Sequence, residues 1–243
     1  MPTALITGAS RGLGRALARA LIRDDWKLVI DARGAADLEA IARELGQLGD
    51  VTALPGDVSD PEHRRALVAA AGDQIDLLVN NASAVGPSPQ PPLALYPPSE
   101  LQRVFRINVL APVALIQLAL PKIPAGGAII NVTSDAAVEA YEGWGGYGSA
   151  KAALDQLTAV LGTEHPDLSV YAVDPGDLRT AMHQRAFPGE DISDRPLPSS
   201  AVPAFLRLLD ERPPSGRYRA ADLLSTLAPT TTLDGGAARP EFS

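Results

Sequence analysis

The stretch Thr3-Ala-Leu-Ile-Thr-Gly-Ala-Ser-Arg-Gly-Leu-Gly14 passes from a short apolar run into a turn with glycines at positions 8, 12 and 14. An amphipathic pattern with a helical period follows from Arg15 to Ile22. A glycine-rich turn between a strand and a helix brings backbone N–H groups and the positive helix end close to a diphosphate, because no Cβ atoms obstruct the approach. The stretch therefore predicts a strand, a phosphate-binding turn and a helix.

The rest of the chain repeats this alternation of apolar runs and amphipathic stretches. The runs predict strands over Thr3–Thr7, Lys27–Asp31, Val51–Pro55, Asp76–Asn80, Ala128–Thr133, Ser169–Asp174 and Arg217–Ala220. The amphipathic stretches predict helices over Gly12–Arg23, Ala35–Leu48, Pro61–Ala71, Ser99–Ala119, Tyr147–Glu164 and Ser199–Leu209. Alternating strands and helices imply an α/β fold with a parallel sheet that is covered on both faces.

Composition limits the classes of partner and site. The chain has 243 residues, enough for one well-buried domain, and its net charge of −8 argues against a nucleic-acid or anionic-membrane surface. We therefore expect a small-molecule partner. With no Cys and three scattered His residues, we expect no disulfide, no thiol chemistry and no metal site. We see no apolar run of about twenty residues, and no basic region followed by an apolar signal core at the N-terminus. We therefore expect a cytoplasmic protein.

Tyr147 and Lys151 form the pattern most suggestive of chemistry. They lie four residues apart in Tyr147-Gly-Ser-Ala-Lys151, so a helix projects both side chains from one face. A nearby ammonium group favours the phenolate and lowers the pKa of a tyrosine from its usual value of about 10, which suits a general acid or base. The same spacing also fits an ordinary surface helix. Ser134 ends the apolar run before it, where active-site groups of parallel sheets tend to lie.

Six separately placed motifs together resemble the short-chain dehydrogenase/reductase family. They are Gly8-x-x-x-Gly12-x-Gly14, Asn80-Asn81-Ala82, Asn108, Ser134, Tyr147-x-x-x-Lys151 and Pro175-Gly176, in the family's order and spacing over essentially the whole chain. The resemblance implies a single-domain, doubly wound Rossmann fold with a seven-stranded parallel sheet in the order 3-2-1-4-5-6-7. We expect this domain over residues 1–225, with a substrate lid at about 178–200 and a flexible tail over 226–243.

The resemblance also assigns roles to residues. It implies that Tyr147 is the general acid, that Lys151 binds the nicotinamide ribose and lowers the pKa of Tyr147, and that Ser134 binds the substrate oxygen. It also implies that Asn108 interrupts a helix and links Lys151 to solvent through water. Alternatively, Ser134 could be a turn residue and Asn108 a polar helix position. The cofactor-binding residues implied are Gly8, Ser10, Arg11, Gly12, Leu13, Gly14, Arg33, Asp57, Val58, Asn80, Ala82, Tyr147, Lys151, Pro175, Gly176, Leu178 and Thr180.

The segment Val29-Ile-Asp-Ala-Arg33 bears on which cofactor binds. In the family's register, the acid typical of NAD-dependent members falls at Ala32, and the base typical of NADP-dependent members falls at Arg33. Together with Arg11 this favours NADP(H). Asp31 keeps NAD(H) open, since a shift of one residue would restore the acid. Asp57 resembles the family's adenine contact. Alternatively it could cap the next helix, although Asp60 is the better candidate for that cap. Ser83 replaces a family glycine.

Substrate residues are the least determined by sequence. Trp144 and Tyr141 could form an aromatic wall, although a core or dimer contact is an equal alternative for Trp144. Met182, His183 and Phe187 fall on the expected lid, and His183 reads as a surface residue there. Asp177 and Arg179 read as solvent-facing charges.

These observations predict an NADPH-dependent reductase of a small, possibly aromatic ketone or aldehyde. The alternatives are an NAD-dependent alcohol dehydrogenase working oxidatively and a non-catalytic NADP(H) sensor. We expect a homodimer or homotetramer, which the resemblance suggests.

Overall fold

The computed structural model describes residues 1–225, and the expected flexible tail at 226–243 lies outside them. Seven parallel strands form one sheet in the order β3-β2-β1-β4-β5-β6-β7, as expected from the sequence. Their bounds are β1 Thr3–Ile6, β2 Lys27–Ala32, β3 Val51–Pro55, β4 Leu77–Asn80, β5 Ala128–Val132, β6 Ser169–Asp174 and β7 Gly216–Arg219. Each strand end lies within two residues of its prediction. The order reverses between β1 and β4, where a ligand crevice forms in such sheets.

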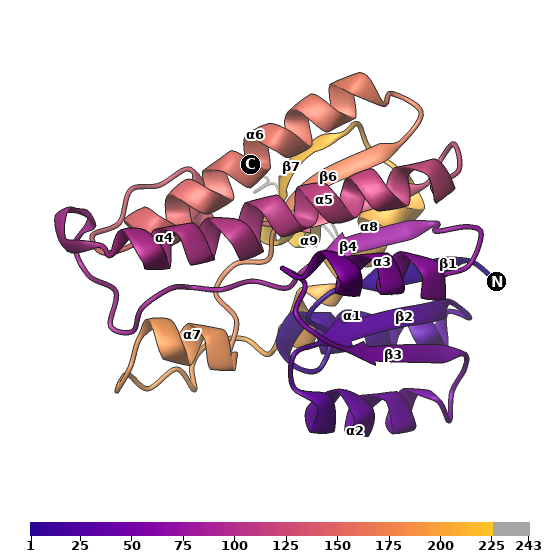
Figure 1. Cartoon of the computed structure of the whole chain (residues 1–243), viewed down its shortest axis with the longest axis horizontal. Coiled ribbons are helices and arrows are strands. Elements are labelled where there is room, and N and C mark those ends of the chain that lie inside the picture. Colours follow the sequence, from indigo (N-terminus) through magenta and orange to yellow (C-terminus); the bar gives the residue numbers. More distant parts are fainter. Residues whose placement is uncertain (226–243) are drawn as a thin grey trace, which may run out of the picture.

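Helices cover both faces of this sheet (Figure 1). They are α1 Gly12–Arg23, α2 Ala35–Leu45, α3 Pro61–Ala70, α4 Pro98–Phe105, α5 Ala111–Ala119, α6 Gly145–Glu164, α7 Ala181–Ala186, α8 Val202–Glu211 and α9 Ala220–Ser225. Helix α7 stands away from the sheet, beyond its carboxyl edge, in the region expected to be a lid.

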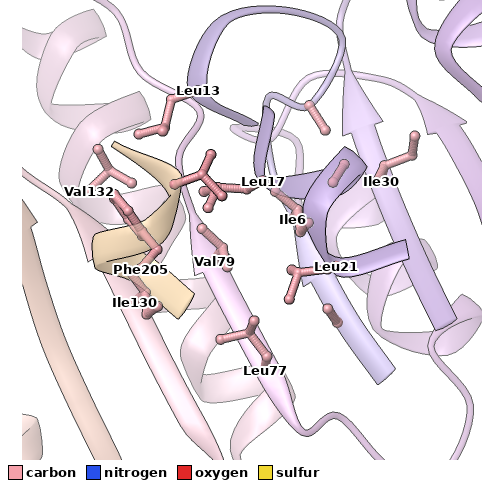
Figure 2. Close-up of a cluster of buried hydrophobic side chains, with 14 of the residues drawn as sticks. Ile6, Leu13, Leu17, Leu21, Ile30, Leu77, Val79, Ile130, Val132 and Phe205 are labelled. Atoms are coloured by element: carbon pink, nitrogen blue, oxygen red, sulfur yellow. The ribbon is translucent and has the colours of Figure 1, made fainter. Parts of the chain in front are cut away.

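Strand alternation divides the core into two layers. Ile6, Ile30 and Val79 belong to the cluster that α1 and α8 cover, together with Leu17 and Phe205 (Figure 2). The intervening strand residues Leu5, Val29 and Leu78 belong to a second cluster with α3 and α5. A parallel sheet buried on both faces needs such continuous apolar strands. Burial of each Leu or Ile side chain contributes about 1.5–3 kcal/mol, so these layers fix the strand ends that carry the site.

The helix expected over Ser99–Ala119 is interrupted. Between α4 and α5, residues Arg106–Leu110 form one π-helical turn, with Asn108 at its centre. Pro112 explains why regular α-helical bonding fails there, because it has no N–H to donate to the carbonyl of Asn108. The wider turn shifts the direction of the Asn108 side chain.

Other helix ends differ by a few residues. Helix α2 ends at Leu45 and leaves Leu48 half exposed, while Ser199 and Ser200 belong to a 3₁₀ turn before α8. Short α7 was not expected from its polar, proline-flanked sequence, and the Thr180 hydroxyl caps it by accepting a hydrogen bond from His183 N at 3.1 Å. The helical stretch Pro98–Lys122 contains an 18-residue window of mean hydropathy 1.7, which is long and apolar enough to cross a membrane, but half of that window is buried within the protein. One such helix argues only weakly for a span, since core helices share this composition.

Candidate active site

A cavity of about 880 Å³ opens above the carboxyl ends of β1, β2, β4, β5 and β6. Most of the residues singled out from the sequence line it. These are Gly8, Ser10, Arg11, Gly12, Leu13, Arg33, Asp57, Val58, Ala82, Ser134, Trp144, Tyr147, Lys151, Pro175, Gly176, Leu178, Thr180, Met182 and His183. Gly14, Asn80 and Asn108 lie outside the lining and act on it from behind.

The glycine-rich turn is packed against the segment after β4. Gly8 has a φ of +68°, and a Cβ there would approach Ala82 Cα to 2.9 Å, so only glycine fits. Gly14 is equally constrained, because its Cβ would meet Asn81 Nδ2 at 2.5 Å. Asn81 Nδ2 donates to the carbonyls of Thr7 at 2.8 Å and Gly8 at 3.1 Å. The family's Asn81 therefore shapes the turn, whereas Gly14 allows its close packing.

Asn80 points into the core. Its Nδ2 donates to Asn131 Oδ1 at 2.8 Å, and Asn131 Nδ2 donates to Thr158 Oγ1 at 2.9 Å. These bonds link β4, β5 and α6 beneath the cavity. The Asn80 side chain therefore joins the strands whose ends carry the site, and the cofactor contact expected of this residue stays a prediction.

Asp31 is bound inside the protein. It is 1% exposed, and its two oxygens accept hydrogen bonds from Gly8 N at 2.7 Å and contact His63 Nε2 at 3.1 Å. The His63 ring in turn packs on Gly56, where a Cβ would lie 2.3 Å from it. Both carboxylate oxygens thus have partners at the base of the first turn. Sequence reasoning treated His63 as one of three scattered histidines, and no local pattern marks a contact across 32 residues.

The adenine end of the cavity carries cations and one engaged carboxylate. Arg11 and Arg33 are exposed and line the cavity. Asp57 accepts a hydrogen bond from Ser59 N at 2.8 Å. Burial acts against its charge, yet this bond and the nearby Arg33 hold the pKa of Asp57 below its usual value. Asp60 caps α3 by accepting from Glu62 N at 3.0 Å, as expected from the sequence.

Tyr147 and Lys151 lie side by side in the buried first half of α6. Lys151 Nζ is 5.6 Å from the Tyr147 ring centroid and donates to the Val132 carbonyl at 2.6 Å. Burial lowers the pKa of Lys151 to about 8, against the opposing charge of Asp155. Burial also raises the pKa of Tyr147 above its usual value, with Asp174 contributing. Burial dominates the pKa of Tyr147 in the protein chain alone, and the lowering by Lys151 that the resemblance implies stays a prediction.

Ser134 follows β5 in an extended conformation. Its hydroxyl donates to Asp135 Oδ1 at 2.7 Å and accepts from Ala136 N at 3.2 Å. Asp135 also accepts from the Tyr141 hydroxyl at 3.0 Å. Although burial opposes it, the bonds from Ser134 and Tyr141 hold the pKa of Asp135 below its usual value. A carboxylate therefore adjoins Ser134 on the cavity wall, and sequence reasoning missed it.

Asn108 is fully buried and binds the segment after β4. Its Oδ1 accepts from Ala84 N at 2.8 Å and from the Ser83 hydroxyl at 3.2 Å, while its Nδ2 donates to the Ala84 carbonyl at 2.9 Å. Ser83 itself lines the cavity, and its side chain acts to lower the pKa of Tyr147. The π turn thus reaches Tyr147 through a hydroxyl that replaces the family glycine.

Aromatic side chains enclose the end of the cavity beside Tyr147. Trp144 lies edge to face with Tyr147 at 5.7 Å between ring centroids, and Phe187 lies 5.6 Å from Trp144. His183 stacks near Phe187 at 4.8 Å and contacts Asp177 Oδ1 at 3.6 Å. Met182 lines the same end from α7. The segment expected to be a lid therefore places Phe187 against Trp144 beside Tyr147, and His183 and Arg195 of this segment pair with Asp177 at the rim.

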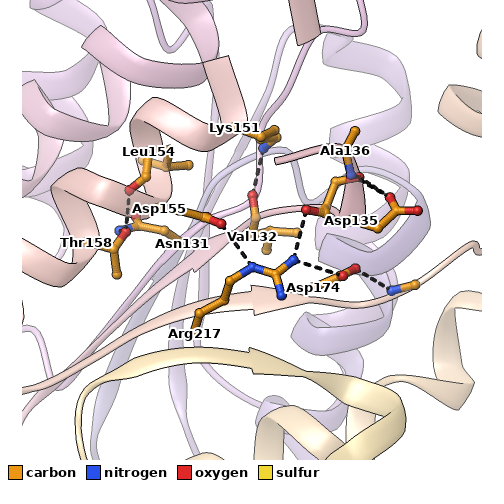
Figure 3. A network of polar contacts seen from close by, with 12 residues as sticks. Asn131, Val132, Asp135, Ala136, Lys151, Leu154, Asp155, Thr158, Asp174 and Arg217 are labelled. Carbon is orange, nitrogen blue, oxygen red and sulfur yellow. Dashed lines mark hydrogen bonds and ion pairs between the residues drawn. The ribbon is translucent and has the colours of Figure 1, made fainter. Parts of the chain in front are cut away.

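Arg217 was also missed from the sequence. It comes from β7, the edge strand, and reaches beneath Ser134 to bind the carbonyl of that residue and two carboxylates (Figure 3). No local motif marks it, since its partners lie 43 to 83 residues away in the chain.

Comparison with known proteins agrees with this arrangement. A family model described as short chain dehydrogenase matches residues 2–191. The chain belongs to the short-chain dehydrogenase family. Its relatives include a serine 3-dehydrogenase of Agrobacterium fabrum, 35% identical over 73% of this chain and 72% of the relative. A benzil reductase ((S)-benzoin forming) of Saccharomyces cerevisiae is 31% identical over 94% and 87%, respectively.

Solved structures of the short-chain dehydrogenase family share the whole architecture. A short chain dehydrogenase from Shigella flexneri, complexed with NADP, superimposes with a TM-score of 0.82 at 27% identity, over 90% of this chain and 97% of that one. Family membership makes this protein an NAD(P)-dependent oxidoreductase. Three features of the cavity fit a dinucleotide. The glycine-rich turn has no room for Cβ atoms, Arg11 and Arg33 lie at one end of the cavity, and Ser134, Tyr147 and Lys151 lie at the other.

Proposed function

We propose that this short-chain dehydrogenase is an NADPH-dependent carbonyl reductase with Tyr147 as the general acid. The observation that carries the proposal is the convergence of Ser134, Tyr147 and Lys151 on one cavity that continues to the glycine-rich turn. A hydroxyl, a phenol and an ammonium group thus lie at one end of a dinucleotide-sized cleft. Together they can donate a proton to a substrate oxygen that lies next to a hydride donor.

In the proposed reaction the bound cofactor supplies hydride to the carbonyl carbon. The Ser134 hydroxyl turns from Asp135 to donate to the substrate oxygen, which fixes that oxygen beside Tyr147. The Tyr147 hydroxyl then gives its proton to the oxygen as negative charge develops there. Lys151, buried and still mostly protonated at neutral pH with a pKa of about 8, stabilises the tyrosinate that results.

The preference for NADPH rests on the charges at the adenine end. A carboxylate that selects NAD must have oxygens free for the ribose hydroxyls. Asp31 is the nearest candidate, and both of its oxygens already bind Gly8 N and His63. Arg11 and Arg33 are exposed at the same end and are suited to a 2′-phosphate. We infer that the cofactor carries this phosphate.

The substrate is inferred to be a small ketone or aldehyde with an aromatic or apolar body. Trp144 and Phe187 flank Tyr147, and Val85 and Ala136 pack in the same cluster. A flat apolar group beside the reacting carbonyl would stack on these rings. The similar benzil reductase acts, by its name, on such a diketone.

We further propose that the chain forms a homodimer or homotetramer through α4, α5 and α6. Exposed apolar side chains lie along these elements, namely Leu110, Leu118, Leu157 and Val160, at 36–61% exposure. Burial of such side chains against a second copy would remove apolar area from water.

The test is oxidation of NADPH and NADH, followed at the nicotinamide absorbance, with aromatic diketones, quinones, pterin-like ketones and β-ketoacyl thioesters. Tyr147→Phe should abolish turnover and retain NADPH binding. Tyr218→Phe is the matched control, because its hydroxyl binds the Pro214 carbonyl away from the cavity. Arg33→Asp should reduce the preference for NADPH over NADH. Tight NADPH binding without turnover, unaffected by Tyr147→Phe, would instead favour the sensor; preferred NADH with alcohol oxidation would favour the oxidative dehydrogenase.

A further inference from the structure

Arg217 lies on the face of the sheet that α6 covers. Within β7, Tyr218 packs on the cluster beneath α8, with its ring 5.7 Å from that of Tyr171. Successive strand side chains point to opposite faces, so Arg217 points the other way, towards α6. The register pairs it with Ala172 of β6, a small residue that leaves space for the guanidinium to pass.

The guanidinium joins three parts of the catalytic end (Figure 3). Its Nε donates to Asp155 Oδ2 on α6 at 3.0 Å, and its Nη2 donates to the Ser134 carbonyl at 3.0 Å and to Asp174 Oδ2 at 3.1 Å. Asp174 ends β6 and holds the next turn by accepting from Gly176 N at 3.0 Å. One side chain thus binds the strand end that carries Ser134, the helix that carries Tyr147, and the turn at Pro175.

The charges in this network are mostly removed from water. The side chains of Asp174 and Asp155 are 4% and 14% exposed, and that of Arg217 is 25% exposed. Asp155 follows Lys151 by one helical turn, so both cations flank it. Burial raises the pKa of Asp155, while bonds with Thr133 and Arg217 oppose this rise. Removal of the guanidinium would leave Asp174 without its counter-charge and Asp155 with Lys151 alone.

We propose that Arg217 is a positioning residue of the reaction, which holds Ser134, α6 and the Pro175 turn in the geometry needed for proton transfer. This inference rests on the proposed function, because it gives Ser134 and Tyr147 the reacting roles. Arg217 does not line the cavity and acts only through its partners.

Arg217 also affects the electrostatic potential at the Tyr147 hydroxyl. The charged groups near that hydroxyl are Lys151 and Asp155 of α6, Asp135 after β5, Asp174 of β6, Arg217 of β7, and Asp177 and His183 of the lid. Asp174 disfavours the phenolate, and Arg217 neutralises Asp174. Without Arg217, the phenolate should form at a higher pH. Without the Asp174 charge, it should form at a lower pH.

The experiment compares Arg217→Met, Arg217→Lys and Asp174→Asn with the wild-type holoenzyme. Arg219→Met is the matched control, because Arg219 lies two residues further on the same face of β7 and is exposed. For each protein we would measure NADPH affinity, circular dichroism and kcat/KM against pH. Phenolate absorbance with NADP⁺ bound, taken as a difference from the same protein carrying Tyr147→Phe, follows the Tyr147 titration without any substrate.

We expect Arg217→Met to keep NADPH affinity within about threefold and to lower kcat/KM about 10- to 100-fold, because small misplacement of reacting groups has effects of this size. Its Tyr147 titration should move to higher pH. Arg217→Lys keeps the positive charge but not the several N–H donors of the planar guanidinium. It should restore the wild-type titration of Tyr147 but only part of kcat/KM. Asp174→Asn should move the titration to lower pH, and Arg219→Met should match the wild type.

The proposal is overturned if folded Arg217→Met has wild-type kcat/KM, or if its Tyr147 titration does not move. A purely structural role would lower the active fraction in every variant without opposite shifts for Arg217→Met and Asp174→Asn. Should Arg217→Met fail to fold, the same comparison holds between Arg217→Lys and Asp174→Asn. Failure of the proposed function gives a different result. Turnover would then be absent from the wild type, or would survive Tyr147→Phe, whereas the phenolate titration would still report on Arg217.

Discussion

Ser83 stands where the family motif has glycine, and its hydroxyl connects two residues of the site. Its hydroxyl donates to Asn108 Oδ1 at 3.2 Å, and when it turns to donate to the Tyr147 phenolate instead it lowers the pKa of Tyr147, against the larger effect of burial. A buried phenol with two serine partners, Ser83 and Ser134, is better oriented than one with a single partner. The added hydroxyl partly compensates for the burial of Tyr147.

Ser83→Gly restores the family residue and should impair this protein. Loss of one hydrogen bond, about 0.5–1.5 kcal/mol, should lower kcat about two- to tenfold and leave KM for NADPH unchanged. The titration of Tyr147 should move to higher pH, since the bond that favours its charged form is lost. The pH dependence of kcat measures this. Ser83→Ala should behave alike, and a wild-type profile in both variants would contradict the role of the hydroxyl.

The buried charge of Lys151 should lower the free energy of unfolding, although the residue is needed for activity. Its pKa is about 8 in the folded protein against 10.5 when unperturbed, so folding disfavours its charge. The unfolded chain therefore binds more protons between these values, and stability rises with pH through this window. The full penalty, roughly 3 kcal/mol at most, is present below pH 8.

Lys151→Met should remove that penalty. We expect its free energy of unfolding to exceed that of the wild type by about 1–2 kcal/mol at pH 7, after loss of the bond to the Val132 carbonyl. The difference should shrink or reverse at pH 10, and turnover should be lost. Urea unfolding at the two pH values gives the answer. Lys122→Met is the control, as Lys122 is only partly buried; equal destabilisation of Lys151→Met at both pH values would refute the argument.

At the scale of elements, the π turn between α4 and α5 positions Asn108 rather than a bound molecule. Asn108→Ala would leave Ala84 N and the Ala84 carbonyl buried without their partners. Each such group costs about 1–3 kcal/mol, so for the two groups we expect a loss of about 2–6 kcal/mol in the free energy of unfolding. Gln117→Ala, at an exposed position of α5, should change it by less than about 0.5 kcal/mol. Denaturant unfolding distinguishes the two, and equal values would contradict this account.

Elements with strong periodicity were predictable, and interrupted ones were not. The bounds of α1 follow from glycine at its start and from Leu17 and Leu21 on one face, and sequence and structure agree on Gly12–Arg23. Periodicity alone did not reveal the π turn, because the apolar pattern continues through it while the backbone changes around Pro112. Only the family resemblance implied a helix interrupted at Asn108. Helix α7 was missed because its six residues bury no side chain fully, so no period marks it.

At the scale of the whole molecule, the sequence placed the motifs but not their long-range partners. The order of the sheet and the approach of Ser134 to Tyr147 and Lys151 follow from motifs in a known order. His63, Asp135 and Arg217 could not be found this way. Contacts of Asp31 with His63, or of Arg217 with Ser134, depend on strand register across the sheet, which no short pattern reports.

Assembly gives a prediction for the whole molecule. Leu157 and Val160 are 40% and 42% exposed on α6, within the face proposed to meet a second copy. The double change Leu157→Glu with Val160→Glu should place charges in that interface and shift the protein to monomer, since buried unpaired charges are strongly disfavoured. Light scattering after size exclusion measures the mass. Leu48→Glu, on an exposed residue beyond α2, should leave the mass unchanged.

The position of Arg217 in the last strand has a consequence for synthesis. A chain emerging from the ribosome makes β1 to β4, with the glycine turn and Asp31, well before β7. Because all seven strands belong to one sheet, the domain folds as a unit and needs β7 to complete that sheet. The guanidinium that joins Ser134, α6 and Asp174 is translated only at residue 217 of 243. The full rate of the reaction should thus be reached only after β7 has been made and has joined β6 in the sheet.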